Sequence, residues 1–110
     1  MPVPEITCEQ LRERLAGPPA QRPVLVDVRN PDEHHYCALP GSVLLPLHEI
    51  DQREDELAAL EGKEVVVYCH HGVRSLHGAA FLRDKGIEAS SLAGGIDRWS
   101  QAIDPSVRRY

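Results

Sequence analysis

The sequence lacks any apolar run that approaches the roughly 20 residues needed for a membrane-spanning helix. It also lacks an excess of positive charge: twelve lysines and arginines against seventeen aspartates and glutamates give a formal net charge of −5. We therefore expect no nucleic-acid partner, because such proteins need a basic stripe that replaces counterions on phosphates. Residues 1–5 contain neither a basic nor an apolar signal region, so we expect a cytoplasmic protein without membrane association.

Cysteines are few and odd in number, which excludes a conventional disulfide framework. Cys8, Cys37 and Cys69 stand at scattered positions, as is typical of reduced thiols in a cytosol. The adjacent histidines at 34–35 and 70–71 lack the C-x₂-C or H-x₃-H spacing of zinc sites. We expect neither a metal nor another cofactor.

What the sequence does contain is ordinary for a small globular protein. Hydrophobic residues make up 42% and charged residues 26% of the 110 positions, close to the averages of soluble proteins. This length suits one hydrophobic core, so we expect residues 1–110 to form one domain. No internal repeat or low-complexity segment is present.

Three short apolar runs predict β-strands, and none of them alternates apolar with polar residues. They are Val24–Val28, Val43–Leu45 and Val65–Tyr68, of which the last is the clearest because three valines follow one another. Runs without such alternation are typical of strands buried on both faces, as in parallel sheets.

Helical patterns alternate with these runs. A capping box at Thr7 and Gln10 predicts a helix that Gly17 ends. Further helices are expected from the spacing of apolar residues in the segments 47–60, 75–85 and 96–103. The alternation predicts an α/β fold with a parallel sheet of four to five strands and helices on both faces. In such sheets, ligands bind at the carboxyl ends of the strands.

One segment at such a strand end carries chemistry. The loop Cys69-His70-His71-Gly72-Val73-Arg74-Ser75 leaves the predicted strand Val65–Tyr68 and opens a helix. Its backbone N–H groups, the helix N-terminus and the Arg74 guanidinium can converge on one anion. Cys69 would lie at their focus as a thiolate nucleophile, and Gly72 would supply the positive φ that a curled loop needs.

Other residues have both a structural and a functional interpretation. Ser75 would cap the helix in the first and hydrogen-bond the sulfur in the second, and one hydroxyl could do both. Cys37 is a candidate resolving thiol, although it and Cys8 are expected to be structural. Trp99 is expected to be a core aromatic residue.

The segment that follows the first predicted strand is expected to be architectural. Arg29 and Glu33 stand four residues apart, which predicts an ion pair at a helix start. Asp27, near the end of the strand, is expected to orient backbone donors of a neighbouring loop.

Four motifs in order make the sequence similar to the rhodanese-like sulfurtransferase family, over nearly the whole chain. They are the cysteine loop 69–75, Asp27-Val28-Arg29 with Pro31 and Glu33, Leu39-Pro40-Gly41-Ser42 with Pro46, and Gly94-Gly95 with Trp99. The resemblance implies a rhodanese-like α/β fold. Cys37-Ala38 departs from the Gly-His that the family often has there, a position peripheral to the chemistry.

The resemblance also implies a reaction, thiosulfate sulfurtransferase (rhodanese-type) chemistry through a Cys69 persulfide. The thiolate would attack the outer sulfur of thiosulfate or another persulfide donor, and a thiol or cyanide would then accept that sulfur. A sulfur-acceptor protein is a further candidate partner. The donor would be bound by the remaining loop residues, with its sulfonate oxygens at Arg74 and a histidine: His70, His71, Gly72, Val73, Arg74 and Ser75.

Two other functions stay open at this point. One is a non-catalytic binding or regulatory module on the same fold, against which the presence of Cys69 counts. The other is a persulfide carrier that delivers sulfur to a protein. Phosphoryl transfer is disfavoured because four residues separate Cys69 from Arg74. Related phosphatases and arsenate reductases have one residue more there, enough to surround a tetrahedral oxyanion.

Overall fold

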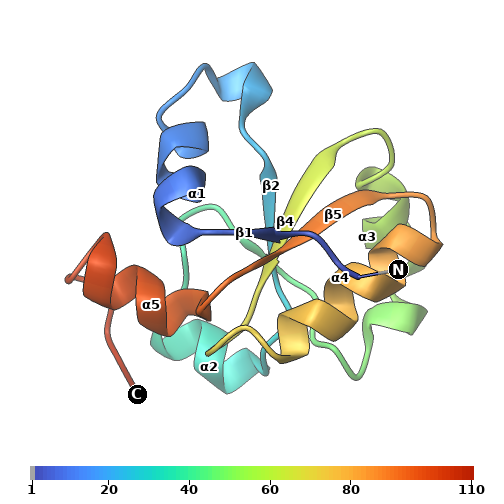
Figure 1. The fold of residues 1–110 in the computed structure, drawn as a ribbon. Helices are drawn as coiled ribbons and strands as arrows, with labels where there is room; N and C mark the ends of the chain where they lie inside the picture. The colour runs from blue at the N-terminus through green and yellow to red at the C-terminus, as the bar shows by residue number, and fades with distance from the viewer. Residues whose placement is uncertain (1) are drawn as a thin grey trace.

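The computed structural model describes residues 2–110, and its centre is a five-stranded sheet (Figure 1). The strands stand in the order β1-β5-β4-β2-β3, and every neighbouring pair is parallel. The strands are β1 (Glu5–Ile6), β2 (Val24–Asp27), β3 (Val43–Leu44), β4 (Glu64–Tyr68) and β5 (Glu88–Leu92). The predicted α/β class with a parallel sheet of four to five strands is confirmed.

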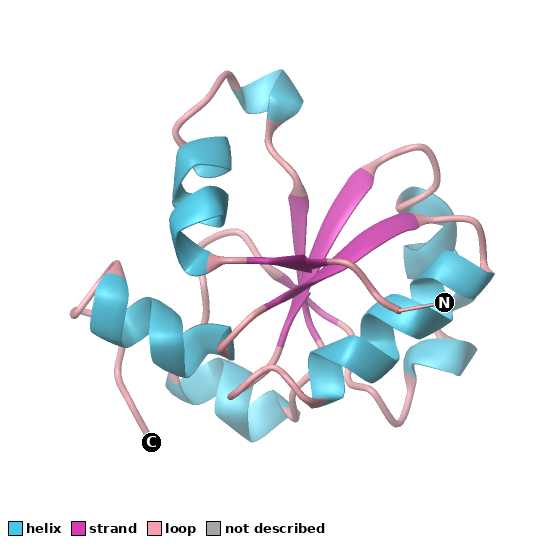
Figure 2. Cartoon of the chain, in the orientation of Figure 1, coloured by secondary structure: helices cyan, strands magenta, loops and turns pink. Residues whose placement is uncertain are grey.

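Helices cover both faces of the sheet, as Figure 2 shows. The apolar residues divide into two clusters, one between the sheet and α1 and α5, the other between the sheet and α3 and α4. The helices are α1 (Cys8–Leu15), α2 (Pro31–Tyr36), α3 (Glu54–Ala59), α4 (Arg74–Asp84) and α5 (Gly95–Ala102), with 3₁₀ turns at Pro19–Gln21 and Ile50–Gln52. Their burial against a central sheet is the main stabilising term of the fold.

The three predicted strands and the capping box at Thr7 are present, but two strands and one helix depart from expectation. β1 and β5 were not predicted: β1 has two residues, and β5 contains two serines rather than a β-branched run. The continuous helix expected over 47–60 is wrong. Residues 47–49 form a turn, Ile50–Gln52 form a 3₁₀ turn, and Arg53 leaves the helical region with φ of −99° and ψ of 58°, so α3 begins only at Glu54.

β4 is the middle strand and positions the loop that follows it. All four residues from Val65 to Tyr68 are fully buried. The end of β2 lies beside the end of β4, because Asp27 is paired with Tyr68 and the Val28 amide donates to the Tyr68 carbonyl at 3.1 Å. The segment after β2 and the cysteine loop after β4 are therefore neighbours at the carboxyl edge of the sheet.

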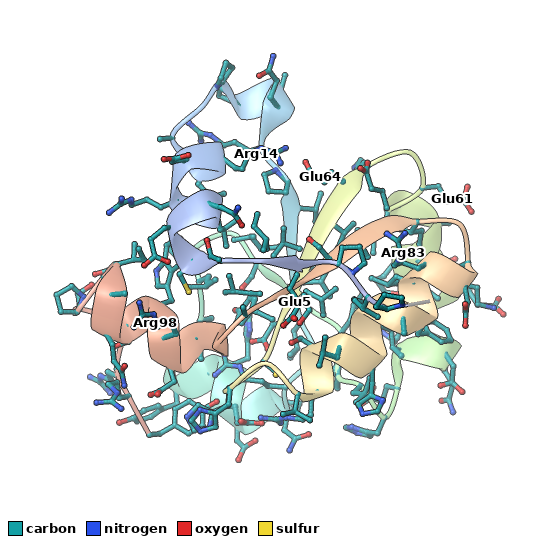
Figure 3. The ribbon with its side chains drawn as sticks, in the orientation of Figure 1. Glu5, Arg14, Glu61, Glu64, Arg83 and Arg98 are labelled. Carbon is teal, nitrogen blue, oxygen red and sulfur yellow. The ribbon has the colours of Figure 1, made fainter. Side chains whose placement is uncertain are left out.

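A surface ion pair joins α1 to the amino end of β4. Figure 3 shows Arg14 of α1 next to Glu64 at the start of β4, and their side chains form a bidentate ion pair. Both groups are partly exposed to solvent, so the pair contributes little stability. Among residues 2–110, no helix is both long enough and apolar enough to cross a membrane.

Candidate active site

The sulfur of Cys69 lies inside a curled loop directly after β4. The residue is almost wholly buried, with 1% of its surface exposed. The Gly72 amide donates to Sγ at 3.1 Å and the Ser75 amide at 3.3 Å. One donor comes from the loop and the other from the first turn of α4, so both the loop and the helix N-terminus face the sulfur. This arrangement favours a negatively charged sulfur.

Ser75 contacts the sulfur and does not cap the helix. Its Oγ lies 3.4 Å from Sγ of Cys69 and 2.7 Å from Oγ of Ser91 in β5. The N-cap position of α4 is Val73, which forms no side-chain cap, so the capping role expected for Ser75 is wrong. Ser91 was not singled out from the sequence, although a serine in a buried strand is a signal for a polar contact.

Two glycines permit the close packing of this loop. Gly72 has φ of 102°, which confirms the predicted positive value. Behind the loop, Gly95 at the start of α5 lies so close that an added Cβ would be 2.4 Å from the His70 carbonyl oxygen. There the Ile96 amide donates to the Cys69 carbonyl at 2.9 Å. The first turn of α5 therefore packs directly on the loop backbone and bonds to it.

Arg74 forms an ion pair with Glu33 beside the loop. Its two terminal nitrogens donate to the two oxygens of Glu33 in α2, at 2.7 and 2.9 Å. The Arg74 hydrogen bonds are the main reason that the pKa of Glu33 is lowered to about 2. The predicted ion pair between Arg29 and Glu33 is wrong, because tertiary contacts give each residue a different partner.

Arg29 is fully buried beside the site and forms a bidentate pair with Asp27. Oδ1 of Asp27 also accepts from the Arg29 amide at 3.0 Å, and Oδ2 lies 2.8 Å from Nδ1 of His34. Asp27 therefore orients its own segment rather than a neighbouring loop, which corrects that expectation. The pair is architectural, because burying either charge alone would be costly.

Among residues 2–110, no side chain of the loop other than Ser75 hydrogen-bonds to the sulfur. His70 and His71 stack on each other with 3.9 Å between ring centroids, and Nδ1 of His71 lies 3.9 Å from a carboxylate oxygen of Asp97. Burial, together with the neighbouring His71, lowers the pKa of His70 below its usual value, which favours the neutral ring. Val73 is 65% exposed and contributes its backbone rather than its side chain to the loop.

Tyr110 is a site neighbour that no sequence pattern indicated. Its ring stacks on His70 with 3.8 Å between centroids and 9° between planes. Its hydroxyl accepts from Arg29 at 2.8 Å and donates to Glu33 at 2.7 Å. Burial is the main cause that raises the pKa of Tyr110, so the hydroxyl keeps its proton. Only the path of the chain after α5 brings this residue to the loop.

The other two cysteines lie outside the loop. Cys8 is the buried first residue of α1, and burial raises the pKa of its thiol to about 11, which makes it unreactive. Cys37 is half-buried, with Sγ 3.8 Å from an Arg29 nitrogen, and all three cysteines are free thiols. Trp99 packs in the cluster beneath α5 with 7% exposed, which confirms it as a core residue. Within residues 2–110, no cluster of His, Cys, Asp and Glu suits a metal.

Comparison with known proteins gives the same fold and family. A model of the rhodanese-like domain matches residues 7–102. A sulfurtransferase from Allochromatium vinosum is 36% identical over 106 residues, which cover 96% of this chain and 95% of that protein. The chain spans between 22% and 62% of seven other curated relatives. The matched region thus also occurs as part of longer proteins.

Solved structures agree with the sequence matches. A rhodanese-related protein from Thermoplasma volcanium superposes with a TM-score of 0.80 at 27% identity, covering 97% of this chain and 99% of that one. The human single-domain sulfurtransferase TSTD1 superposes with a TM-score of 0.76 at 26% identity, covering 90% and 96%. The chain therefore belongs to the rhodanese-like family and resembles its single-domain sulfurtransferases.

Proposed function

We propose that this protein is a sulfurtransferase that carries sulfane sulfur as a persulfide on Cys69. The observation that supports this most directly is the convergence of the Gly72 and Ser75 amides on one buried sulfur. Such preorganised donors stabilise a thiolate before the reaction and a persulfide anion after it. Thiosulfate is the proposed donor, and a thiol, cyanide or a protein thiol is the acceptor.

The first step transfers one sulfur atom. The Cys69 thiolate attacks the outer sulfur of thiosulfate, the bond between that sulfur and the sulfonate breaks, and sulfite leaves with the bonding electrons. In the second step an acceptor thiolate attacks the outer sulfur of the persulfide and releases Cys69 as a thiolate. Charge balances in both steps and no proton moves, so no general base is needed.

Arg74 is the proposed contact for the sulfonate. A guanidinium has five N–H donors, and the pair with Glu33 uses two of them. The others are free to bind an anion beside the loop. His70, being neutral, would offer a hydrogen bond rather than a charge. Free thiols at all three cysteines fit a reducing cytoplasm, where we place the reaction.

The size of the loop favours sulfur over phosphate as the transferred group. Four residues separate Cys69 from Arg74, and two backbone amides are already directed at the single sulfur atom. A tetrahedral oxyanion would need further inward-facing donors and a wider loop. Sulfur transfer is therefore the better-supported chemistry.

Intact-mass spectrometry after incubation with thiosulfate tests the proposal. The wild-type protein should gain the mass of one sulfur atom and lose it when cyanide or a thiol is added. The Cys69→Ser variant should gain none while keeping the same thermal unfolding curve. Cys37→Ser is the matched control and should behave like the wild type.

Two outcomes would contradict the proposal. Undiminished turnover in Cys69→Ser would show that the sulfur is carried elsewhere. The absence of any adduct on the wild-type protein, with every tested persulfide donor, would favour a binding or regulatory module on this fold.

A further inference from the structure

Tyr110 contacts the cysteine loop directly at His70 and is linked to Arg74 through Glu33. Its ring lies flat on His70, the residue after the nucleophile, and its hydroxyl donates to Glu33, which is bonded to Arg74. The ring edge of Tyr36 packs against it with 5.9 Å between centroids. The side chain of Tyr110 thus lies along one rim of the loop, on His70 directly and beside Arg74 through Glu33.

Two neighbouring groups of the loop are shut off from solvent. Cys69 is only 1% exposed, although any acceptor must reach its outer sulfur. Nε2 of His70 is buried and forms no hydrogen bond to any residue from 2 to 110. A buried polar atom without a partner destabilises the protein, and such an atom at a site points to a group that binds there. The buried sulfur and the unpaired nitrogen belong to consecutive residues, Cys69 and His70, and the Tyr110 ring lies on the second of them.

We propose that Tyr110 is a specificity-determining residue of the sulfurtransferase reaction and that its ring selects acceptors by size. The inference rests on the proposed function. The Tyr110 ring occupies the approach to the persulfide beside His70, so a small thiol passes it and a bulky thiol does not. An acceptor that enters also supplies the hydrogen-bond partner that Nε2 of His70 lacks.

The geometry of the second sulfur transfer limits the size of the acceptor. Its thiolate must attack the outer sulfur of Cys69–S–S⁻ in line with the breaking S–S bond, so that Cys69 leaves as a thiolate and the acceptor becomes the persulfide. The substituents next to the attacking sulfur must therefore fit between the loop and the Tyr110 ring. Tyr110 is 45% exposed, and removing its ring would widen this side of the site.

The test measures discharge of a Cys69 persulfide formed beforehand, with two neutral acceptors. 2-Mercaptoethanol is the small acceptor and reduced lipoamide the bulky one. In Tyr110→Ala the ratio of the second-order rate constants, bulky over small, should rise about five-fold or more, since steric exclusion at an enzyme site is commonly of that order. Tyr110→Phe keeps the ring and should leave the ratio within about two-fold of the wild type. Val43→Ala, an exposed apolar residue of β3, is the matched surface control.

The ratio separates selection from mere structural support. If Tyr110 only stabilises the loop, Tyr110→Ala slows both acceptors equally and the ratio stays constant, which overturns the inference. An equal rise in Tyr110→Phe and Tyr110→Ala also overturns it, because the hydroxyl rather than the ring would then be responsible. A wild-type protein that forms no persulfide refutes the proposed function itself, and that result is seen before any acceptor is added.

Discussion

The guanidinium of Arg74 is bound to a carboxylate, and this contact changes the charge that a ligand would meet. Its hydrogen bonds to Glu33 raise the pKa of Arg74 and fix its plane beside the loop. In the proposed function, a donor anion would therefore meet a prearranged cation whose charge is partly balanced. Removing the arginine would leave the Glu33 carboxylate facing the approaching donor, so repulsion is added to the loss of attraction.

For this reason Arg74→Ala should weaken thiosulfate use far more than use of a neutral organic persulfide. We expect kcat/KM for thiosulfate to fall roughly ten-fold or more relative to the neutral donor, as is typical for loss of a charge-assisted hydrogen bond. Steady-state kinetics with the two donors measure the difference. The double variant Arg74→Ala/Glu33→Gln should recover part of the loss. Equal losses with both donors would mean that Arg74 does not contact the sulfonate.

At the scale of elements, the site depends on helix α5 as much as on β4 and α4. The Ile96 and Asp97 amides donate to the carbonyls of Cys69 and His70 at 2.9 and 3.1 Å. These bonds fix the loop backbone so that its own amides can turn inward. They require the helix to begin in contact with the loop, where a Cβ on Gly95 would lie 2.6 Å from the Cys69 carbonyl oxygen.

Gly95→Ala should therefore lower both stability and sulfur transfer. The new methyl group must push α5 from the loop, and φ at this position is +63°, so we expect a loss of about 2–4 kcal/mol in the free energy of unfolding. Denaturant unfolding measures it. Gly86→Ala is the matched control: its φ is +82° but no atom lies within 4 Å of an added Cβ. The control should lose only about 1 kcal/mol, from backbone strain alone. Similar losses in both variants would show that the contact with the loop is not the cause.

On the scale of the whole molecule, a chain of charged and polar side chains joins four segments around the site. It runs from Asp27 to Arg29, through the hydroxyl of Tyr110 to Glu33, and ends at Arg74. Asp27 and Arg29 lie at the end of β2, Tyr110 follows α5, and Glu33 and Arg74 belong to α2 and α4, so the network holds distant parts of the sequence together. Net acidity of the chain does not describe this region, where cations and anions alternate.

The pH dependence of folding should reflect this network. The pKa of Glu33 is lowered from 4.5 to about 2, mainly by Arg74, so its stabilising effect is present above pH 4.5 and is lost as the pH falls towards 2. Between pH 5 and 2.5, the free energy of unfolding should fall about 2 kcal/mol less in Glu33→Gln than in the wild type. Urea unfolding at several pH values measures it. Glu61→Gln, an exposed carboxylate labelled in Figure 3, is the control and should follow the wild type. A wild-type slope in Glu33→Gln would contradict the assignment.

Features that depend on neighbours in the sequence were predictable. The valine run of β4, the capping box at Thr7 and the loop after Tyr68 are local patterns, and the structure contains all three. β5 was missed because its serines have no strand signal: Ser91 is buried by pairing with β4 and by bonding to Ser75. The helix expected over 47–60 failed because Arg53, with φ of −99° and ψ of 58°, separates the 3₁₀ turn from α3.

The sequence by itself therefore determined the class of fold, the place of the cysteine loop and its curl, because side-chain periodicity and a glycine act on the adjacent backbone. Only the tertiary structure decided which charges pair. Arg29, Glu33 and Arg74 could each have formed several ion pairs, and the contacts of β2, α2 and α4 selected one arrangement. The same holds for Tyr110, whose place on His70 depends on the course of the chain after α5. Pairing energies depend on distance in space, and spacing in the sequence carries no information about that distance.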